Sequence, residues 1–268
     1  MSGLRLVLRA PLQARLDCSA LAPAALAGLG EAAAERLLLP YGTGRAALGD
    51  LFTVTRGASA ALVISGDPRL DGVGAGLSVG EILVDGPIGA GGGRGMAGGR
   101  LVVRGDAGDD LATGMAGGRI EVSGGAGARL GGPVPGARAG MRAGLVKVGG
   151  GAGPGLGTRL RGGLILIGGD AGERAAEAMI AGTLAVAGSI GPRAGRGMRR
   201  GSLLLGRAPE HLPAGFASSG AGDFVLLLLL ARRVPEIAAL FGGGVSGRAE
   251  RLVGDRLSGG EGEMLLLR

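Results

Sequence analysis

The sequence predicts an all-β fold, a parallel right-handed β-helix of about eight 19-residue glycine-rich rungs with a small α/β N-terminal flank and a helical C-terminal flank. Three observations support this prediction. Glycine provides 62 of the 268 residues, methionines recur at multiples of one period, and short apolar runs follow glycine at fixed positions. Because aromatic residues make up only 2% of the chain, the core must be built from aliphatic side chains and methionine.

The methionine spacing defines the period. Successive members are 19, 26, 38 and 19 residues apart, which is a 19-residue repeat with one seven-residue insertion. The members are Met96, Met115, Met141, Met179 and Met198. We expect residues 60–207 to form stacked rungs with these side chains in a continuous core, and the longer rung 117–142 to protrude as a loop.

Two glycine columns share this period. The first precedes each β-prone run and comprises Gly80, Gly99, Gly118, Gly144, Gly163, Gly182 and Gly201. Two and four places after each of these glycines the residue is apolar, which is typical of a strand that buries one face. The second column follows each run and comprises Gly86, Gly105, Gly124, Gly150, Gly169 and Gly188. We expect both columns to supply the positive φ of tight turns.

The flanks differ from the repeats. Residues 4–8 alternate in hydropathy and predict a strand, and short helices are predicted over 22–28 and 31–39. Asp223 is a candidate cap for a helix over 224–240, which Pro235 would break or kink. We expect three parts: residues 1–50, an N-terminal strand and short helices that cap the solenoid; residues 51–207, the glycine-rich β-helix; and residues 208–268, a C-terminal helix and tail.

Composition excludes several classes of protein. With one cysteine, Cys18, and one histidine, His211, the chain can form neither an internal disulfide nor a Cys/His zinc cluster. We interpret Cys18 as a small buried side chain and His211 as a loop residue without a catalytic partner. No signal-peptide pattern opens the sequence, and the longest apolar run, 224–231, is far shorter than the roughly 20 residues of a membrane span. We therefore expect a soluble, cytoplasmic protein that does not bind membranes.

Two motifs favour a structural interpretation. Residues 93–98 match G-x-G-x-x-G, but they precede a predicted strand, whereas a dinucleotide site needs a strand before the motif and a helix after it. Asp106, Asp109 and Asp110 form an acidic group, which we interpret as turn carboxylates, not as metal ligands. We expect no catalytic and no metal-binding residues in this chain.

The arginines are the candidate binding residues. The net charge is +7, and all but one of the 29 basic residues are arginine. Arg142, Arg161 and Arg199 occupy one repeat column, interrupted by Ile180, and Arg200 follows directly. Further arginines near this stripe are Arg138, Arg159, Arg193 and Arg196. Two interpretations remain open: a solvated face that reflects composition, or a face for an acidic partner protein or a polycarboxylate ligand.

The repeat resembles a known one. GGRLVVRGDAG followed by GMAGG, and GGRIEVSGGAG followed by GMRAG, are similar to the glycine-rich β-helix of two families over about 150 residues. These are the C-terminal domain of the glutamate synthase large subunit and the C subunit of formylmethanofuran dehydrogenase. The free-standing chain, the stretch YGTGRAALGDLFTVTRG before the repeats, the inserted GGPVPGARAG and the closing GPRAGRGMRRGSLLL favour the second family.

This resemblance implies a function. The arginine-rich composition looks bacterial, and bacterial relatives belong to a formyltransferase/hydrolase complex of one-carbon metabolism. There a formyl group passes from a tetrahydromethanopterin carrier to a methanofuran-type amine and is then hydrolysed to formate, as part of formaldehyde oxidation in methylotrophs. The implied role is that of a non-catalytic scaffold subunit. The implied partners are an amidohydrolase-like subunit, a formyltransferase subunit and a further subunit, which would hold zinc and the methanofuran or methylofuran cofactor with its glutamate residues.

An alternative stays open. A glutamate-synthase-like β-helix subunit in ammonia transfer would need a glutaminase nucleophile or cluster cysteines, and Cys18 alone supplies neither. Nucleic-acid binding through the basic charge is disfavoured because the chain has almost no aromatic surface on which bases could stack.

Overall fold

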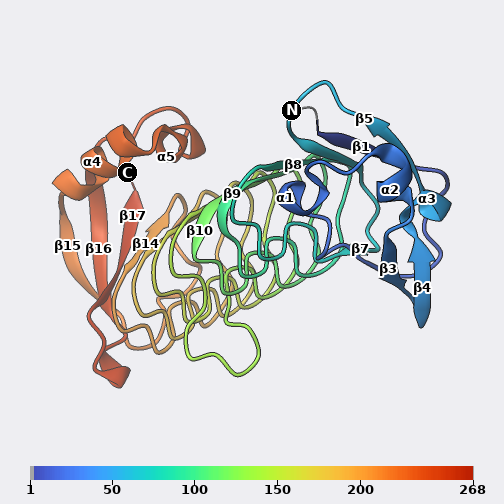
Figure 1. Cartoon of the computed structure of the whole chain (residues 1–268). Helices are drawn as coiled ribbons and strands as arrows, with labels where there is room; N and C mark the ends of the chain where they lie inside the picture. Colours follow the sequence, from blue (N-terminus) through green and yellow to red (C-terminus); the bar gives the residue numbers. More distant parts are fainter. Residues whose placement is uncertain (1–2, 268) are drawn as a thin grey trace.

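A mixed sheet of 13 strands forms the body of the protein. The computed structural model describes residues 3–267 and adds a separate four-stranded sheet in the order β4-β3-β2-β7. Figure 1 shows an elongated molecule in which successive repeats lie side by side, with the N-terminal elements at one end and the C-terminal elements at the other.

The elements follow the chain in this order: β1 (Leu4–Leu8), β2 (Leu16–Asp17), α1 (Pro23–Leu26), α2 (Glu31–Glu35), β3 (Leu38–Tyr41), β4 (Gly44–Ala47), α3 (Leu48–Leu51), β5 (Phe52–Arg56), β6 (Leu62–Ser65), β7 (Leu70–Asp71), β8 (Glu81–Asp85), β9 (Ala97–Val103), β10 (Gly117–Val122), β11 (Leu145–Val148), β12 (Leu164–Ile167), β13 (Thr183–Val186), β14 (Ser202–Leu205), β15 (Ala217–Asp223), α4 (Val225–Arg233), α5 (Pro235–Leu240), β16 (Arg248–Gly254), the 3-10 helix η1 (Arg256–Ser258) and β17 (Gly262–Leu267).

The strands at the centre of the sheet are parallel and pair one repeat apart. Ile82 lies opposite Leu101, and Leu101 lies opposite Ile120, each 19 residues further along the chain. Ile120 lies opposite Val146, so the seven inserted residues leave the register intact and loop out between β10 and β11. Single bridges on another side of each repeat join Ile88, Ala107, Ala126, Ala152, Ala171 and Ile190 in turn.

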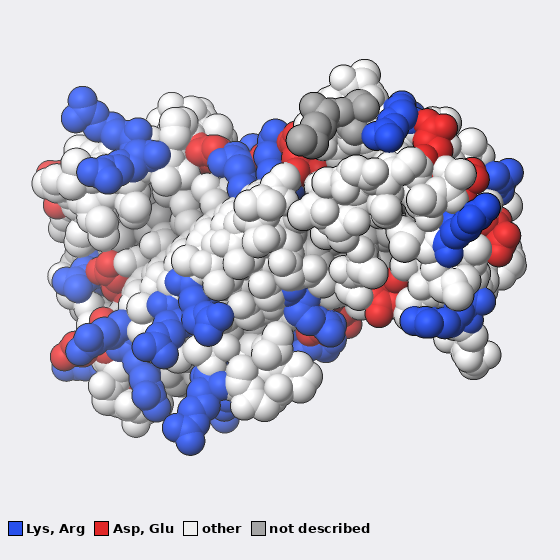
Figure 2. Space-filling view, viewed as in Figure 1, with Lys and Arg blue, Asp and Glu red and all other residues white. Residues whose placement is uncertain are grey.

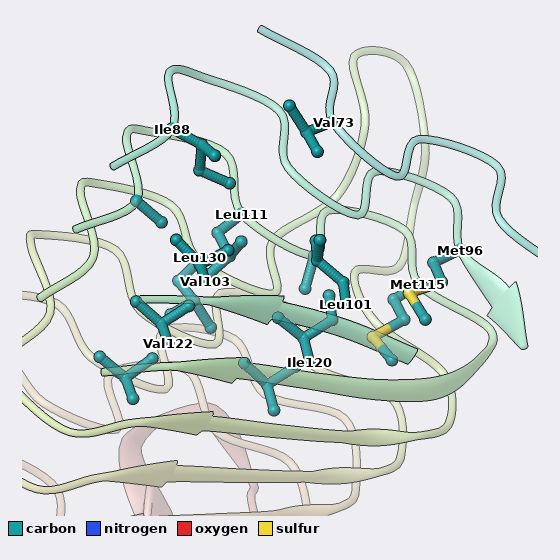
Figure 3. Close-up of a cluster of buried hydrophobic side chains, with 14 of the residues drawn as sticks. Val73, Ile88, Met96, Leu101, Val103, Leu111, Met115, Ile120, Val122 and Leu130 are labelled. Atoms are coloured by element: carbon teal, nitrogen blue, oxygen red, sulfur yellow. The ribbon is translucent and has the colours of Figure 1, made fainter. Parts of the chain in front are cut away.

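Apolar side chains from each repeat stack in the interior. Figure 3 shows Met96 and Met115 next to each other, beside Leu101 and Ile120. All five methionines of the repeat column are 0% exposed. Methionine suits this position because its unbranched, flexible thioether fills the irregular space beside the glycine corners.

The first glycine column adopts a left-handed backbone conformation that is unfavourable for residues with a side chain. All seven members have φ between 70° and 99°. Space is restricted as well, because a Cβ at Gly118 would lie 2.6 Å from the carbonyl oxygen of Gly98 and 2.7 Å from the methyl carbon of Met96. Glycine is therefore required at this corner for two separate reasons.

The second glycine column has a different physical basis from the one predicted. Of its six members only Gly86 has a positive φ. The others lie where consecutive repeats approach at backbone distance: a Cβ at Gly150 would be 2.9 Å from the carbonyl carbon of Gly124. The predicted positive φ is wrong for five positions, where the missing side chain is what matters.

The predicted fold class, an all-β parallel right-handed β-helix, is wrong for this chain. The 13-stranded sheet is mixed, because β5 pairs antiparallel with β1 at one edge and β15, β16 and β17 pair antiparallel at the other. Within residues 3–267, five α-helices also lie in the two flanks. The columns on which the prediction rested cover only the middle of the chain, so they carried no information on how the flanks pair.

One helix cap and one helix end are also corrected. The helix expected over 224–240 is broken before Pro235, as predicted, into α4 and α5. Asp223 ends β15 and is not the cap; the residue at the N-cap is Phe224, without a side-chain hydrogen bond. The helix expected over 31–39 ends at Glu35, and β3 begins at Leu38.

Helices α4 and α5 cover the outer side of the sheet at its C-terminal end. They contribute Leu227 and Ile237 to a second buried apolar cluster, whose sheet members are Leu166, Ala185, Leu204, Ala249 and Leu265. An ion pair of 2.7 Å between the Arg119 guanidinium and the Glu236 carboxylate fastens α5 to β10. The helices are thus held by apolar burial and by a salt bridge at the margin.

Within residues 3–267 no helix combines the length and the hydrophobicity needed to cross a bilayer. The predicted boundaries at residues 50 and 207 stay predictions. The large sheet runs across both, since β1 pairs with β6 and β14 pairs with β17.

The first prediction concerns the glycine corners. Gly118→Ala should lower the free energy of unfolding by at least about 2 kcal/mol, because it adds steric overlap to left-handed backbone strain, and Gly118→Val should be worse because valine is β-branched. Gly95, with φ +63° and nothing within 4 Å of its ideal Cβ, is the matched control. Gly95→Ala should cost only about 1–2 kcal/mol of strain. Equal losses in urea unfolding for the two alanine variants would contradict the assignment.

Candidate functional site

Backbone hydrogen bonds stack the arginine column of the repeats. The amide of Arg142 donates to the Met115 carbonyl at 2.7 Å, and that of Arg161 donates to Met141 at 2.9 Å. The amides of Ile180 and Arg199 donate in the same way to the carbonyls of Leu160 and Met179, each in the preceding repeat, at 2.8 Å each. Arg142 and Arg161 therefore lie about 4.8 Å apart at the backbone, and Arg199 lies two repeats beyond Arg161.

The four predicted residues Arg142, Arg161, Arg199 and Arg200, here called the basic edge, are all exposed. Figure 2 shows Lys and Arg side chains gathered at the lower left of the molecule, with few acidic side chains among them. A groove of about 690 Å³ lies along part of this surface, lined by Arg161, Ile180, Ala181, Arg199, Arg200, Ser258, Gly259 and Glu261. The structure therefore brings three of the four residues into one groove and leaves Arg142 outside its lining.

Residues from the C-terminal hairpin, which consists of β16, β17 and the segment between them, complete the groove. The amide of Glu261 donates to the Arg199 carbonyl at 2.8 Å, so the segment before β17 lies directly beside the last repeat. Its carboxylate lies 4.0 Å from Nε of Arg200, and such an exposed pair stabilises little. Ser258 and Glu261 could not be predicted from the sequence, because they occur outside the repeats and no periodic signal marks them.

Several arginines elsewhere in the chain are paired with carboxylates. Arg100 bonds to Glu81 at 2.8 Å and to Glu121 at 2.9 Å, and hydrogen bonding to Glu121 raises the pKa of Arg100. Arg129 bonds to Asp110 at 2.7 Å. Among residues 3–267, by contrast, Arg142, Arg161 and Arg199 make no ion pair. The basic edge therefore presents guanidinium groups that an external carboxylate can bind in a bidentate manner.

Asp255 positions the part of the C-terminal hairpin that lines the groove. Its buried carboxylate accepts hydrogen bonds from the Gly197 amide at 3.0 Å, the Leu257 amide at 3.0 Å and the Ser258 hydroxyl at 3.2 Å. Burial acts to raise the pKa of Asp255, but these hydrogen bonds outweigh it and hold the pKa below its usual range. Asp255 thus ties the last repeat to the segment that carries Ser258 and Glu261.

The other singled-out residues lie apart from the basic edge. His211 is exposed in the loop after β14, where it lines a pocket of about 630 Å³ together with Arg193, Arg196 and Asp255. Cys18 is fully buried. Burial raises the pKa of its thiol, and the charges of Asp17 and Asp71 raise it further, so the thiol stays protonated at neutral pH.

The acidic group of the sequence has structural contacts. Asp106 accepts from the Gly125 amide at 2.7 Å and Asp109 from the Ala128 amide at 2.8 Å, each one repeat away. Within the described part of the chain no group of three or more His, Cys, Asp or Glu side chains is placed to hold a metal ion. The G-x-G-x-x-G segment at 93–98 runs into β9, a strand, so it lacks the helix of a dinucleotide site.

The chain is similar to known proteins both in sequence and in structure. No protein-family model matches the chain. The chain is similar to the C subunit of the formyltransferase/hydrolase complex Fhc of Methylorubrum extorquens, with 44% identity over 90 residues, a segment that spans 33% of each chain. It is also similar to a chain in the crystal structure of the formyltransferase/hydrolase complex FhcABCD from Methylorubrum extorquens in complex with methylofuran. That match has a TM-score of 0.90 and 40% identity and covers 98% of both chains.

The second prediction concerns Asp255. Asp255→Asn should lower the free energy of unfolding by about 1–3 kcal/mol near neutral pH, because an amide cannot accept all of the hydrogen bonds. The lowered pKa means that the carboxylate stabilises the fold fully above the ordinary aspartate pKa of about 3.9, and that this contribution is lost as the pH falls through the lower folded-state value. The difference between parent and variant in urea unfolding should therefore shrink at about pH 3. A difference that does not change with pH would contradict the role of the charge.

Proposed function

Because the chain belongs to the C-subunit family of formyltransferase/hydrolase complexes, we propose that it is a non-catalytic scaffold subunit of such a complex. The complex would transfer a formyl group from a tetrahydromethanopterin carrier to a methanofuran-type cofactor and hydrolyse it to formate. Partner subunits of amidohydrolase and formyltransferase type would hold the zinc and the cofactor. A cytoplasmic location is part of the same proposal.

The basic edge supports a scaffold role. It is a row of arginines of which Arg142, Arg161 and Arg199 have no carboxylate partner among residues 3–267, and it continues along a groove that the C-terminal hairpin completes. Such a row repels itself unless acidic groups lie across it. We assign it to docking of the acidic surface of a neighbouring subunit. Binding of the glutamate residues of the cofactor is the second candidate role, since the similar Methylorubrum extorquens complex was crystallised with methylofuran.

The third prediction tests this docking. Replacing Arg142, Arg161 and Arg199 together by Glu should weaken assembly with the other subunits about tenfold or more at low salt, where charges are least screened. Assembly is followed by size-exclusion chromatography of co-expressed subunits. If complexes still assemble but the KM for the cofactor rises, the row binds the cofactor instead.

A matched control separates docking from net charge. Arg5, Arg36 and Arg45 make no ion pair within residues 3–267 and lie at the N-terminal end. Their replacement by Glu changes the net charge equally and should leave assembly unchanged. If the variant of Arg142, Arg161 and Arg199 shows unaltered assembly and an unaltered KM at low salt, the basic edge has no binding role and is only a solvated surface.

The fourth prediction concerns catalysis. The isolated chain should neither transfer nor hydrolyse formyl groups, because its one cysteine is a buried, protonated thiol and its one histidine lies in an exposed loop. His211→Ala in the assembled complex should keep turnover within a few-fold of the parent. A loss of several orders of magnitude would refute the non-catalytic assignment.

A further inference from the structure

Helix α4 presents an apolar face to solvent. The exposed fractions are 66% for Val225, 45% for Leu226, 44% for Leu228 and 53% for Leu229. At about 100° per residue these four side chains fall on one side of the helix together with Arg232 and Arg233. Leu227 points to the opposite side and is 1% exposed. The helix is therefore apolar on both sides, and the described chain covers only one of them.

The packing of α4 within the chain does not explain why its outer side is apolar. The inner side of α4 packs against the sheet through Leu227, and an ordinary surface helix carries polar residues on its other face. Elsewhere large exposed apolar side chains are scattered, as at Leu38 and Val79. Within the described chain, only α4 gathers four of them in five consecutive residues, which is the pattern of an interaction site.

We propose that α4 inserts its outer face into an apolar groove of another subunit of the complex, whose carboxylates face Arg232 and Arg233. This inference rests on the proposed function. The spacing of Val225, Leu226, Leu228 and Leu229 matches the i, i+3, i+4 anchors of helix-in-groove recognition. Charge complementarity identifies the chemistry of the partner, because Arg232 and Arg233 are exposed at one end of the apolar face and make no ion pair within the described residues.

A second copy of the chain fits less well. The nine residues of α4 span only about 13 Å, so a contact between two such helices falls well short of the roughly 800 Å² per partner of a stable interface. A larger subunit with a groove surrounds α4 and extends the contact onto the exposed residues of β15 and α5. A bilayer also fits poorly, because membrane-surface helices carry basic residues along a solvated polar face, whereas the inner face of α4 is packed on the sheet.

The first test changes the apolar face. Leu226→Gln with Leu229→Gln keeps helix propensity nearly constant and alters only exposed side chains. The control is Leu38→Gln with Val79→Gln, which removes two apolar side chains that are 57% and 61% exposed. Co-expression with the other subunits of the complex from the same organism, followed by purification and binding measurements, should show at least about tenfold weaker association for the α4 variant. The control should assemble like the parent.

The second test changes the charges. Arg232→Glu with Arg233→Glu should weaken association more at low salt than at high salt, whereas the glutamine variant should show little dependence on salt. Far-ultraviolet circular dichroism and thermal unfolding establish that each variant is folded.

The outcomes separate the two proposals. If the parent chain does not associate with the other subunits, the proposed function fails. If the parent associates and the α4 variants associate equally well, only the present inference fails. Self-association of the parent that the glutamine variant abolishes, or binding of the parent to phosphatidylcholine and phosphatidylglycerol vesicles with normal assembly of the variant, would also overturn it.

Discussion

Backbone contact between successive repeats determines the rest of the structure. The amide of Arg161 reaches the carbonyl of Met141, and the amide of Gly150 reaches that of Gly124, so different sides of a repeat are hydrogen-bonded to the previous one. Consecutive repeats can approach this closely only where side chains are absent or point into the core or into solvent, away from the neighbouring repeat. A side chain at Gly118 or Gly150 would place its Cβ against the backbone of the previous repeat. The stacking therefore specifies the register of every residue in the repeats.

The electrostatic pattern follows from this register. Residues one repeat apart meet at the same position, so Glu81 lies beside Arg100 and Asp109 lies beside the backbone amide of Ala128. Where opposite charges share a position, the surface is neutralised within the chain. At the corner after the buried methionines, Arg142 and Arg161 share a position instead. The same stacking that pairs charges elsewhere places like charges together along the basic edge.

Features that recur with the 19-residue period could be predicted from the sequence. The buried methionines and the adjacency of Arg142 and Arg161 follow from spacing alone, because stacking converts a 19-residue interval into contact. Periodicity cannot tell why a residue recurs, so positive φ was wrongly assigned to the glycine column that contains Gly150, where close approach is the reason. Asp255 and Glu261 each lie outside the repeats, and their places depend on how the C-terminal hairpin folds back under the last repeat.

The ends of the sheet explain why the fold is mixed. Here β5 and β15 form the two outer strands, each paired antiparallel with its neighbour. The C-terminal segment that forms one of these ends also contributes Glu261 to the groove, and its helices α4 and α5 cover the outer side of the sheet. Regular repeats form periodic surfaces. The C-terminal segment that follows them is not periodic, so it can combine charged and apolar groups. The groove and the exposed face of α4 both lie in this segment.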